Sequence, residues 1–117
     1  MRDTIKKHSD FAIEPDENVA RCGYCLIRAR PIRFGGKPQY GLVATLRTFG
    51  GAVPRNRAKR LLRDWIRFNE KWMRDDRDYI FICRRAILDA TRTDGRVAMK
   101  KALRYLGRLD NTATKDE

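Results

Sequence analysis

Residues 55–67 form the densest group of anion-binding side chains in the sequence. They read Arg-Asn-Arg-Ala-Lys-Arg-Leu-Leu-Arg-Asp-Trp-Ile-Arg, with six cations and a single acid, Asp64. Guanidinium groups form paired hydrogen bonds with phosphates and stack on bases. At about 100° per residue, the apolar and cationic positions fall on opposite arcs of one helix. The segment therefore predicts a helix that presents a cationic face to a polyanion.

The spacing of the cations supports this prediction. Lys59, Arg63 and Arg67 follow an i, i+4, i+8 pattern, which makes a line roughly 12 Å long on a helix, with Asn56 and Arg60 beside it. Like charges four residues apart repel by a few tenths of a kcal/mol, and an external anion would offset that cost. A merely solvated charged face remains the alternative interpretation.

The composition points to the same kind of partner. The chain has 117 residues, 42% of them hydrophobic, and its 27 Lys and Arg against 15 Asp and Glu give a net charge of +12. Small domains this basic typically bind nucleic acids, because cations release counterions from phosphates. No apolar run approaches the ~20 residues of a membrane span, and residues 1–8 lack the apolar stretch of a secretory signal. We expect a cytoplasmic protein without a membrane partner.

Other chemistry has weaker support in the sequence. Cys22 and Cys25 have CxxC spacing, but zinc needs four ligands and only Cys83 and His8 remain to complete the set. A thioredoxin-like pair should open a helix, whereas this pair lies in a strand-like run. Small buried or half-buried thiols are therefore favoured over metal or redox function. We predict no catalytic side chain and no metal site in the protein.

Periodicity predicts an α+β fold in one domain spanning 1–117, with 1–10 and 110–117 flexible. Strands are expected at 23–30 and 40–47, a long helix at 52–73, a strand at 79–83, and a last helix starting near Thr93 or Asp94. The strand at 79–83 is apolar on both faces, which is typical of the middle of a sheet. In the strand 23–30, Tyr24, Leu26, Arg28 and Arg30 are expected to share one face. Asp75, Asp76 and Asp78 are expected to solvate a helix end.

The run from Gly50 to Arg63, in its strand–helix–strand setting, resembles the central motif of the bacterial ribonuclease P protein family. The resemblance extends back to Tyr40-Gly41-Leu42 and forward through 78–84 to the last helix. It implies a small, mostly antiparallel sheet packed with a long basic helix and a C-terminal helix. It also implies a left-handed βαβ crossover, against the usual rule.

The resemblance implies that this chain is the protein subunit of ribonuclease P, which cuts the 5′ leader from precursor tRNA. In that family the RNA subunit carries the hydrolysis and requires Mg2+, while the protein itself binds no cofactor. The expected partners are the ribonuclease P RNA and precursor tRNA. The implied contacts to the catalytic RNA are Arg55, Asn56, Arg57, Lys59, Arg60 and Arg63, and we extend the line to Arg67.

The resemblance also implies a cleft for the single-stranded leader. Phe11, within Ser9-Asp10-Phe11, and Tyr24 are candidates for stacking on leader bases, and ordinary packing is the alternative for both. Arg28 lies on the expected strand face of Tyr24. Arg47 keeps one of the two charges that the family carries before the long helix, and Thr48 replaces the other.

Three other functions remain open from the sequence. A ribosomal-type or other structured-RNA-binding protein would have similar basic faces. A DNA-binding module would place the helix in a major groove, although a run of arginines without base-reading neighbours favours backbone contact. A self-sufficient nuclease would need side chains for acid–base chemistry that the sequence does not offer.

Overall fold

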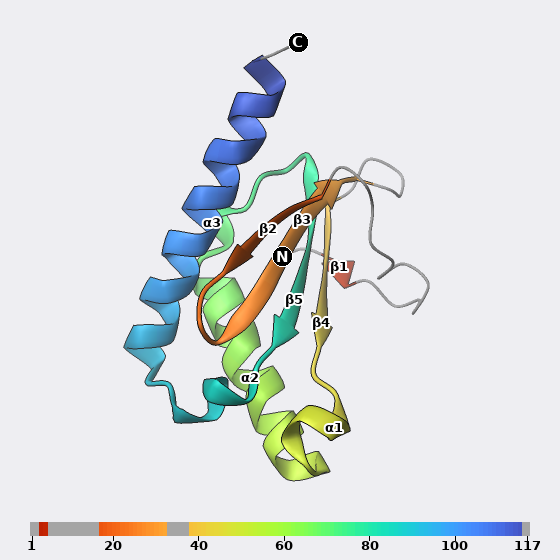
Figure 1. The fold of residues 1–117 in the computed structure, drawn as a ribbon, viewed down its shortest axis with the longest axis vertical. Coiled ribbons are helices and arrows are strands. Elements are labelled where there is room, and N and C mark those ends of the chain that lie inside the picture. Colours follow the sequence, from red (N-terminus) through yellow and green to blue (C-terminus); the bar gives the residue numbers. More distant parts are fainter. Residues whose placement is uncertain (1–2, 5–16, 33–37, 116–117) are drawn as a thin grey trace.

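The computed structural model describes residues 3–4, 17–32 and 38–115. Within these ranges the chain forms one sheet with two long helices packed against it (Figure 1). The strands are β1 (Asp3–Thr4), β2 (Asn18–Arg21), β3 (Cys25–Pro31), β4 (Gln39–Val43) and β5 (Arg77–Cys83). The helices are α1 (Leu46–Phe49), α2 (Ala52–Phe68) and α3 (Arg92–Lys115), with short 3-10 turns η2 (Glu70–Trp72) and η3 (Arg85–Asp89).

The described strands are ordered β1-β4-β5-β3-β2 across the sheet. The β2–β3 and β3–β5 pairs are antiparallel, as predicted, whereas β1–β4 and β4–β5 are parallel. The sheet is mixed because the connection from β4 to its neighbour β5 runs through α2 rather than through a hairpin. The predicted α+β class is confirmed, as is the central place of the apolar strand β5. The left-handed crossover stays a prediction.

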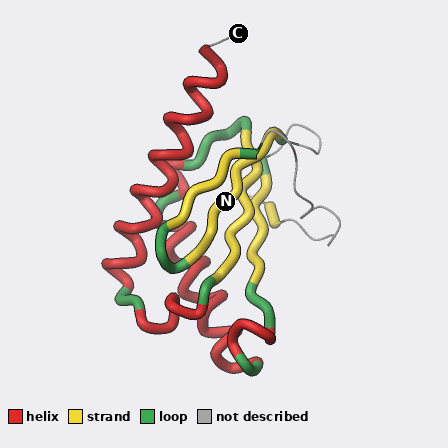
Figure 2. Tube along the Cα trace, in the orientation of Figure 1, coloured by secondary structure: helices red, strands yellow, loops and turns green. Residues whose placement is uncertain are grey.

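The core lies between one face of the sheet and the helices α2 and α3. Ile27 of β3 and Phe81 of β5 are paired across the strands and fully buried. Leu62 and Trp65 of α2 and Leu103 of α3 are fully buried in the same cluster. Figure 2 shows the strands and the helices as separate layers. This packing fixes which face of α2 can point to solvent.

The predicted strand 40–47 ends early, at Val43, and a short helix replaces its last residues. Thr45 caps α1, since its hydroxyl accepts the N–H of Thr48 at 3.2 Å. Gly50 closes α1 with a left-handed φ of 75°, and its N–H donates to the carbonyl of Leu46. In a continuing strand Leu46 would share a face with Leu42 and the buried Ala44, but it lies on α1 and is 56% exposed. The strand does not continue because Thr45 caps a helical turn at this point.

The long helix also ends earlier than predicted, at Phe68 rather than near residue 73. Asn69 is fully buried beyond its end, and its Nδ2 donates to the carbonyls of Trp65 and Arg96 at 3.0 Å each. The Trp65 carbonyl also accepts the backbone N–H of Asn69 at 3.0 Å, so the Asn69 side chain adds a second donor there and joins the end of α2 to α3. Phe68, the last residue of α2, is 55% exposed, and the Arg96 guanidinium lies 4.2 Å from its ring centroid.

The last helix begins slightly before the predicted Thr93 or Asp94. Thr91 supplies the cap, because its hydroxyl accepts the N–H of Asp94 at 3.0 Å. At the other end α3 continues to Lys115, through residues that were expected to form a flexible tail. Residues 3–4, within the other segment expected to be flexible, pair with β4 as β1.

The acidic cluster after α2 is divided between the surface and the interior. Asp76 is exposed and pairs with Arg74 at 2.8 Å, which lowers the pKa of its carboxyl, chiefly through that hydrogen bond. Asp78 lies in β5 and is fully buried; its Oδ1 accepts the N–H of Gln39 at 2.7 Å. The prediction that Asp78 solvates a helix end is therefore wrong, since it holds β4 beside β5.

Among the described residues, the helices are all too short or too polar to cross a bilayer.

Candidate nucleic-acid interface

The solvent side of α2 carries a narrow line of polar and cationic side chains. Ala58, Leu62, Trp65 and Ile66 are the buried residues of the helix and fix its inner face. At about 100° per residue the opposite arc is only ~60° wide. It holds Asn56, Arg60, Arg63 and Arg67, all of them exposed. We call these four residues the α2 basic line.

The α2 basic line is free of carboxylate partners within the part of the chain that the structure describes. Asp64, the acid of this helix, turns instead toward the start of α3. Its carboxylate accepts hydrogen bonds from Arg96 at 3.0 and 3.2 Å, and Arg92 lies 3.9 Å away. The exposed arginines of α2 therefore keep their charge uncompensated, which is the electrostatic condition for binding a polyanion.

Two predicted contact residues flank the line on the side of β4 and β5. Arg55 is half-buried, and its Nε donates to the carbonyl of Ala44 at 2.5 Å. Lys59 is also half-buried, and its pKa is lowered by burial and by the charges of Arg55 and Arg63. A bound phosphate would relieve that repulsion.

Arg57 flanks the line on the opposite side, toward α3. It is exposed and lines a pocket of about 210 Å³ with Arg60, Leu61, Asp64 and Arg92. Arg92 could not be placed here from the spacing of residues, because it is 35 positions from Arg57 and meets it only through the packing of α3 on α2. The seven predicted RNA-contact residues thus share α2, and Arg92 of α3 adds a further cation beside them.

The residues predicted to contact the leader lie farther apart in the structure than those predicted to contact the catalytic RNA. Tyr24 lies in the turn between β2 and β3, half-buried, with its ring centroid 5.6 Å from that of Trp65. Arg28 is buried on the sheet face away from the helices and donates to Glu17 at 2.6 and 2.8 Å. The prediction of one shared face is wrong for these two residues, because Tyr24 precedes β3 and escapes its alternation.

The other two leader candidates stand apart from this pair. Arg47 is exposed, but on α1 rather than at the end of a strand. Phe11 lies outside the described residues. The role of all four residues as leader contacts stays a prediction.

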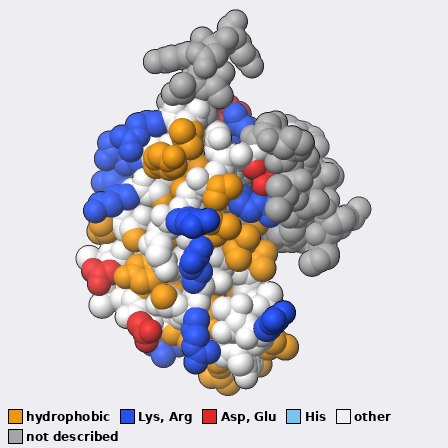
Figure 3. All heavy atoms as spheres, in the orientation of Figure 1, with side chains coloured by type: hydrophobic (Ala, Val, Ile, Leu, Met, Phe, Trp, Pro, Cys, Tyr) orange, Lys and Arg blue, Asp and Glu red, His pale blue; other side chains and the backbone are white. Residues whose placement is uncertain are grey.

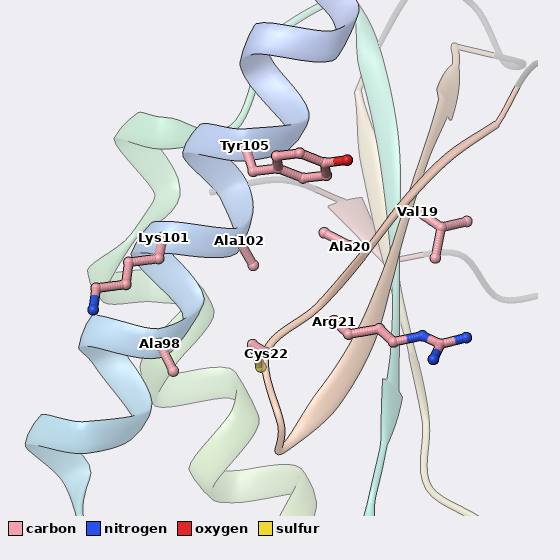
Figure 4. A pocket seen from close by; sticks show the side chains of 8 residues that line it. All are labelled: Val19, Ala20, Arg21, Cys22, Ala98, Lys101, Ala102 and Tyr105. Carbon is pink, nitrogen blue, oxygen red and sulfur yellow. The ribbon is translucent and has the colours of Figure 1, made fainter.

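The sheet face away from the helices offers exposed side chains that the sequence analysis did not single out. Val19 is 44% exposed and Arg21 is exposed, and both point away from α3 (Figure 4). Their period-2 spacing in β2 was the available signal. Figure 3 shows Lys and Arg side chains distributed across the visible face.

In the described part of the chain, no group of three or more His, Cys, Asp or Glu side chains is placed to hold a metal ion. The arrangement can therefore bind and position an anionic polymer through its guanidinium groups, and we derive no bond-breaking step from its side chains.

Known proteins resemble this chain in both sequence and fold. A family model described as Ribonuclease P matches residues 2–107. A ribonuclease P protein component from Pelotomaculum thermopropionicum is 32% identical over 92 residues, which cover 74% of this chain and 77% of the relative. The ribonuclease P protein of Staphylococcus aureus superposes with a TM-score of 0.71 at 21% identity, covering 87% of this chain and 93% of that one. The Thermotoga maritima protein gives a TM-score of 0.63 at 21% identity, covering 77% and 84%.

The fold and the α2 basic line define a small α+β domain that binds a polyanion. The family match extends over nearly the whole chain and includes every residue of that line. The chain belongs to the ribonuclease P protein family, the protein components of an endoribonuclease that works with an RNA partner in the 5′ processing of tRNA.

Proposed function

We propose that this protein binds the catalytic RNA of ribonuclease P through α2 and helps it to hold precursor tRNA. The observation that carries the proposal is the α2 basic line, whose arginines have no carboxylate partner among the described residues. Arg55, Arg57 and Lys59 extend the contact on both flanks. Arginine suits this role because its planar fork matches phosphate oxygens.

The chemistry in this proposal belongs to the RNA. We assign hydrolysis, and the Mg2+ that it requires, to the RNA subunit, as the family resemblance implies. The protein supplies cations that neutralise phosphates, which allows two RNAs to approach each other at a lower concentration of divalent ions.

We further propose that the 5′ leader passes over the sheet face away from the helices, toward α1. Arg47 is exposed and available for a phosphate contact there. Arg28 can contact the leader only if a phosphate replaces Glu17 as its ion-pair partner. Tyr24 can stack on a leader base only if its ring moves away from Trp65. Phe11 is retained as the candidate for base stacking, worth about 1–3 kcal/mol for each stacked base.

Reconstitution tests the proposal directly. The protein is mixed with a bacterial ribonuclease P RNA and a precursor tRNA at a magnesium concentration where the RNA alone cleaves poorly. We expect the protein to restore cleavage at the 5′ end and to form a complex with the RNA. RNA alone and protein alone serve as controls, and cleavage by protein alone would overturn the assignment of the chemistry to RNA.

Competition separates the proposal from the other open functions. Ribosomal RNA and duplex DNA are added at moderate salt as competitors for the ribonuclease P RNA. We expect neither to displace it at an equal concentration of nucleotides. Preferential binding of ribosomal RNA would favour a ribosomal-type protein, and preferential binding of duplex DNA would favour a DNA-binding module.

A further inference from the structure

The turn between β2 and β3 contains two cysteines that RNA binding does not use. Cys22, Gly23, Tyr24 and Cys25 form a tight hairpin in which the Cys22 N–H donates to the Cys25 carbonyl at 3.1 Å. Gly23 has a φ of 86°, a left-handed conformation that glycine adopts without strain. The two cysteines are therefore directly opposite each other across the hairpin.

This backbone geometry suits a disulfide. Opposed residues of a hydrogen-bonded antiparallel pair have Cα atoms about 5.5 Å apart, within the range of roughly 4.4–6.8 Å that disulfides span. The Sγ atoms of Cys22 and Cys25 are already 3.2 Å apart. Closing the bond needs adjustment of the two side chains and leaves the paired backbone in place.

The two thiols differ in their access to a reagent. Cys22 is half-buried and lines a groove of about 710 Å³ between β2 and α3, together with Ala98, Ala102 and Tyr105 (Figure 4). Cys25 is fully buried on the core side of β3, opposite Cys83 of β5. A small molecule in the groove can reach Cys22, while Cys25 stands directly behind it.

The electrostatics favour Cys22 as the nucleophile. A hydrogen bond from Cys25 lowers the pKa of Cys22 to about 6, against the opposing effect of burial and with help from backbone hydrogen bonds and Arg84. The same hydrogen bond and burial raise the pKa of Cys25. A thiolate that a reagent can reach, with a protonated thiol beside it, is the arrangement that reacts by thiol–disulfide exchange.

We propose that Cys22 and Cys25 form a dithiol site that is oxidised reversibly by low-molecular-weight disulfides entering the groove between β2 and α3. The Cys22 thiolate attacks one sulfur of the small disulfide, the S–S bond breaks, and one thiolate leaves. Cys25 then loses its proton and attacks the Cys22 sulfur, expelling the second thiolate. The protein loses two hydrogens as the small disulfide becomes two thiols, and an excess of small thiol reverses the sequence.

This inference is independent of the proposed RNA function. It is compatible with a reducing compartment, where protein disulfides are typically transient. The competing interpretation is that all three cysteines are inert packing residues. Cys83 provides an internal reference, because burial raises its pKa to about 12 and it has no thiol partner in hydrogen-bond contact among the described residues.

Mass spectrometry of the full chain tests the proposal. The reduced protein is incubated with oxidised glutathione, and the remaining thiols are blocked with iodoacetamide before peptide mapping. We expect the loss of two hydrogens from the intact protein, a Cys22–Cys25 linkage, and one blocked thiol at Cys83. A disulfide to Cys83, a link between two chains, or a stable glutathione adduct on the wild-type chain would overturn the proposal.

Three variants assign the roles of the sulfurs. Cys25→Ser should stop after the first step and keep one glutathione on Cys22, whereas Cys22→Ser should remain unmodified under the same conditions. Cys83→Ala is the matched control and should form the disulfide as the wild type does. A Cys25→Ser chain that gains no glutathione contradicts the proposal. If that variant fails to fold, the presence or absence of the Cys22–Cys25 disulfide in the wild-type chain still tests the proposal.

Discussion

The ion pair of Asp64 determines which cations of α2 lack a carboxylate partner among the described residues. Asp64 lies beside the α2 basic line but accepts its hydrogen bonds from Arg96. The carboxylate of Asp64 is partly exposed, so this pair contributes modestly to stability. Its main consequence is that the single acid of the helix is engaged by α3 and leaves Arg60, Arg63 and Arg67 without compensation.

The first prediction concerns a single guanidinium of the line. Arg63→Ala should weaken binding to the ribonuclease P RNA and reduce the slope of log affinity against log salt by about one, because one phosphate contact is lost. Its thermal unfolding should match that of the wild type, since the Arg63 side chain is exposed and makes no hydrogen bond or ion pair with the described residues.

Lys71→Ala is the matched control, because it removes one exposed cation in η2, away from the line. It should leave the salt slope of RNA binding unchanged. Equal losses of affinity in both variants would indicate a general effect of net charge rather than a contact at Arg63.

The second prediction concerns the acidity of Cys22. With its pKa lowered from 9.0 to about 6, Cys22 should remain a thiolate at neutral pH and become protonated as the pH falls below about 6. The rate of its alkylation by iodoacetamide should follow that titration, and at pH 7 Cys22 should react at least about tenfold faster than Cys83.

The groups that face Cys22 set the control for this measurement. Cys25 donates the hydrogen bond, and the charge of Arg84 adds a smaller effect in the same direction. Cys25→Ala should therefore shift the alkylation profile of Cys22 to higher pH. A wild-type profile centred near 9 would show that the hydrogen bond does not stabilise the thiolate.

At the scale of elements, the contact between α2 and α3 depends on a glycine and an asparagine. Gly95 is buried, and a Cβ atom there would overlap the indole ring of Trp65. Asn69 joins the same two helices through the carbonyls of Trp65 and Arg96. The close approach of the two helices brings Arg92 and Arg96 next to Asp64 and thereby leaves the α2 basic line without a carboxylate partner among the described residues.

The third prediction follows from this close approach. Gly95→Ala should destabilise the protein by about 1–3 kcal/mol, because the added methyl group forces Trp65 or α3 to move. Gly107→Ala in the same helix has open space around its Cβ position. It should stabilise the protein by up to about 1 kcal/mol through helix propensity.

Chemical denaturation of both glycine variants checks the signs of the two effects. Stabilisation by Gly95→Ala would show that the packing of α3 on Trp65 is looser than the structure indicates.

The fourth prediction concerns Trp65 itself, which is fully buried and packs against Gly95 of α3 and the ring of Tyr24. Trp65→Ala should lower the free energy of unfolding by about 3–5 kcal/mol, a large part of the stability of a small domain. Tyr105→Ala, which truncates an exposed aromatic on α3, should change it by less than about 1 kcal/mol. Denaturant titrations provide the comparison, and similar losses in both variants would contradict the assigned core.

At the scale of the whole molecule, basic surface is not confined to α2. Residues 96–108 of α3 contain Arg96, Lys100, Lys101, Arg104 and Arg108 and no acid. Lys100 and Arg104 lie 5.1 and 5.4 Å from the ring centroid of Trp72, so part of this charge is held over an aromatic side chain. Cationic side chains therefore lie on α3 as well as on α2, and we propose that the α2 basic line supplies the ordered contact to RNA.

The fifth prediction is a steep salt dependence for the complex. Each neutralised phosphate contributes a slope of about −0.7 to −0.9, so the six proposed cationic contacts give roughly −4 to −5. These are Arg55, Arg57, Lys59, Arg60, Arg63 and Arg67. Affinity for the ribonuclease P RNA measured between low and moderate salt provides the slope. A value near zero would show that binding does not rest on phosphate contacts.

The sequence by itself determined the elements with strong periodicity and the site that one helix carries. The contact residues from Arg55 to Arg67 share α2, so their arrangement follows from a rise of about 1.5 Å and a turn of about 100° per residue. The central position of β5 in the sheet was also predicted correctly from the sequence, because a central strand is apolar on both faces.

Only the tertiary structure decided the contacts between distant segments. The burial of Asp78 against Gln39, the pairing of Arg28 with Glu17, and the capture of Asp64 by Arg96 join residues far apart in the sequence. Local spacing carries no information about such partners, because they depend on which strand lies beside which and on where α3 meets α2. These long-range contacts distinguish the arginines that pair with carboxylates inside the fold from those that we propose bind RNA.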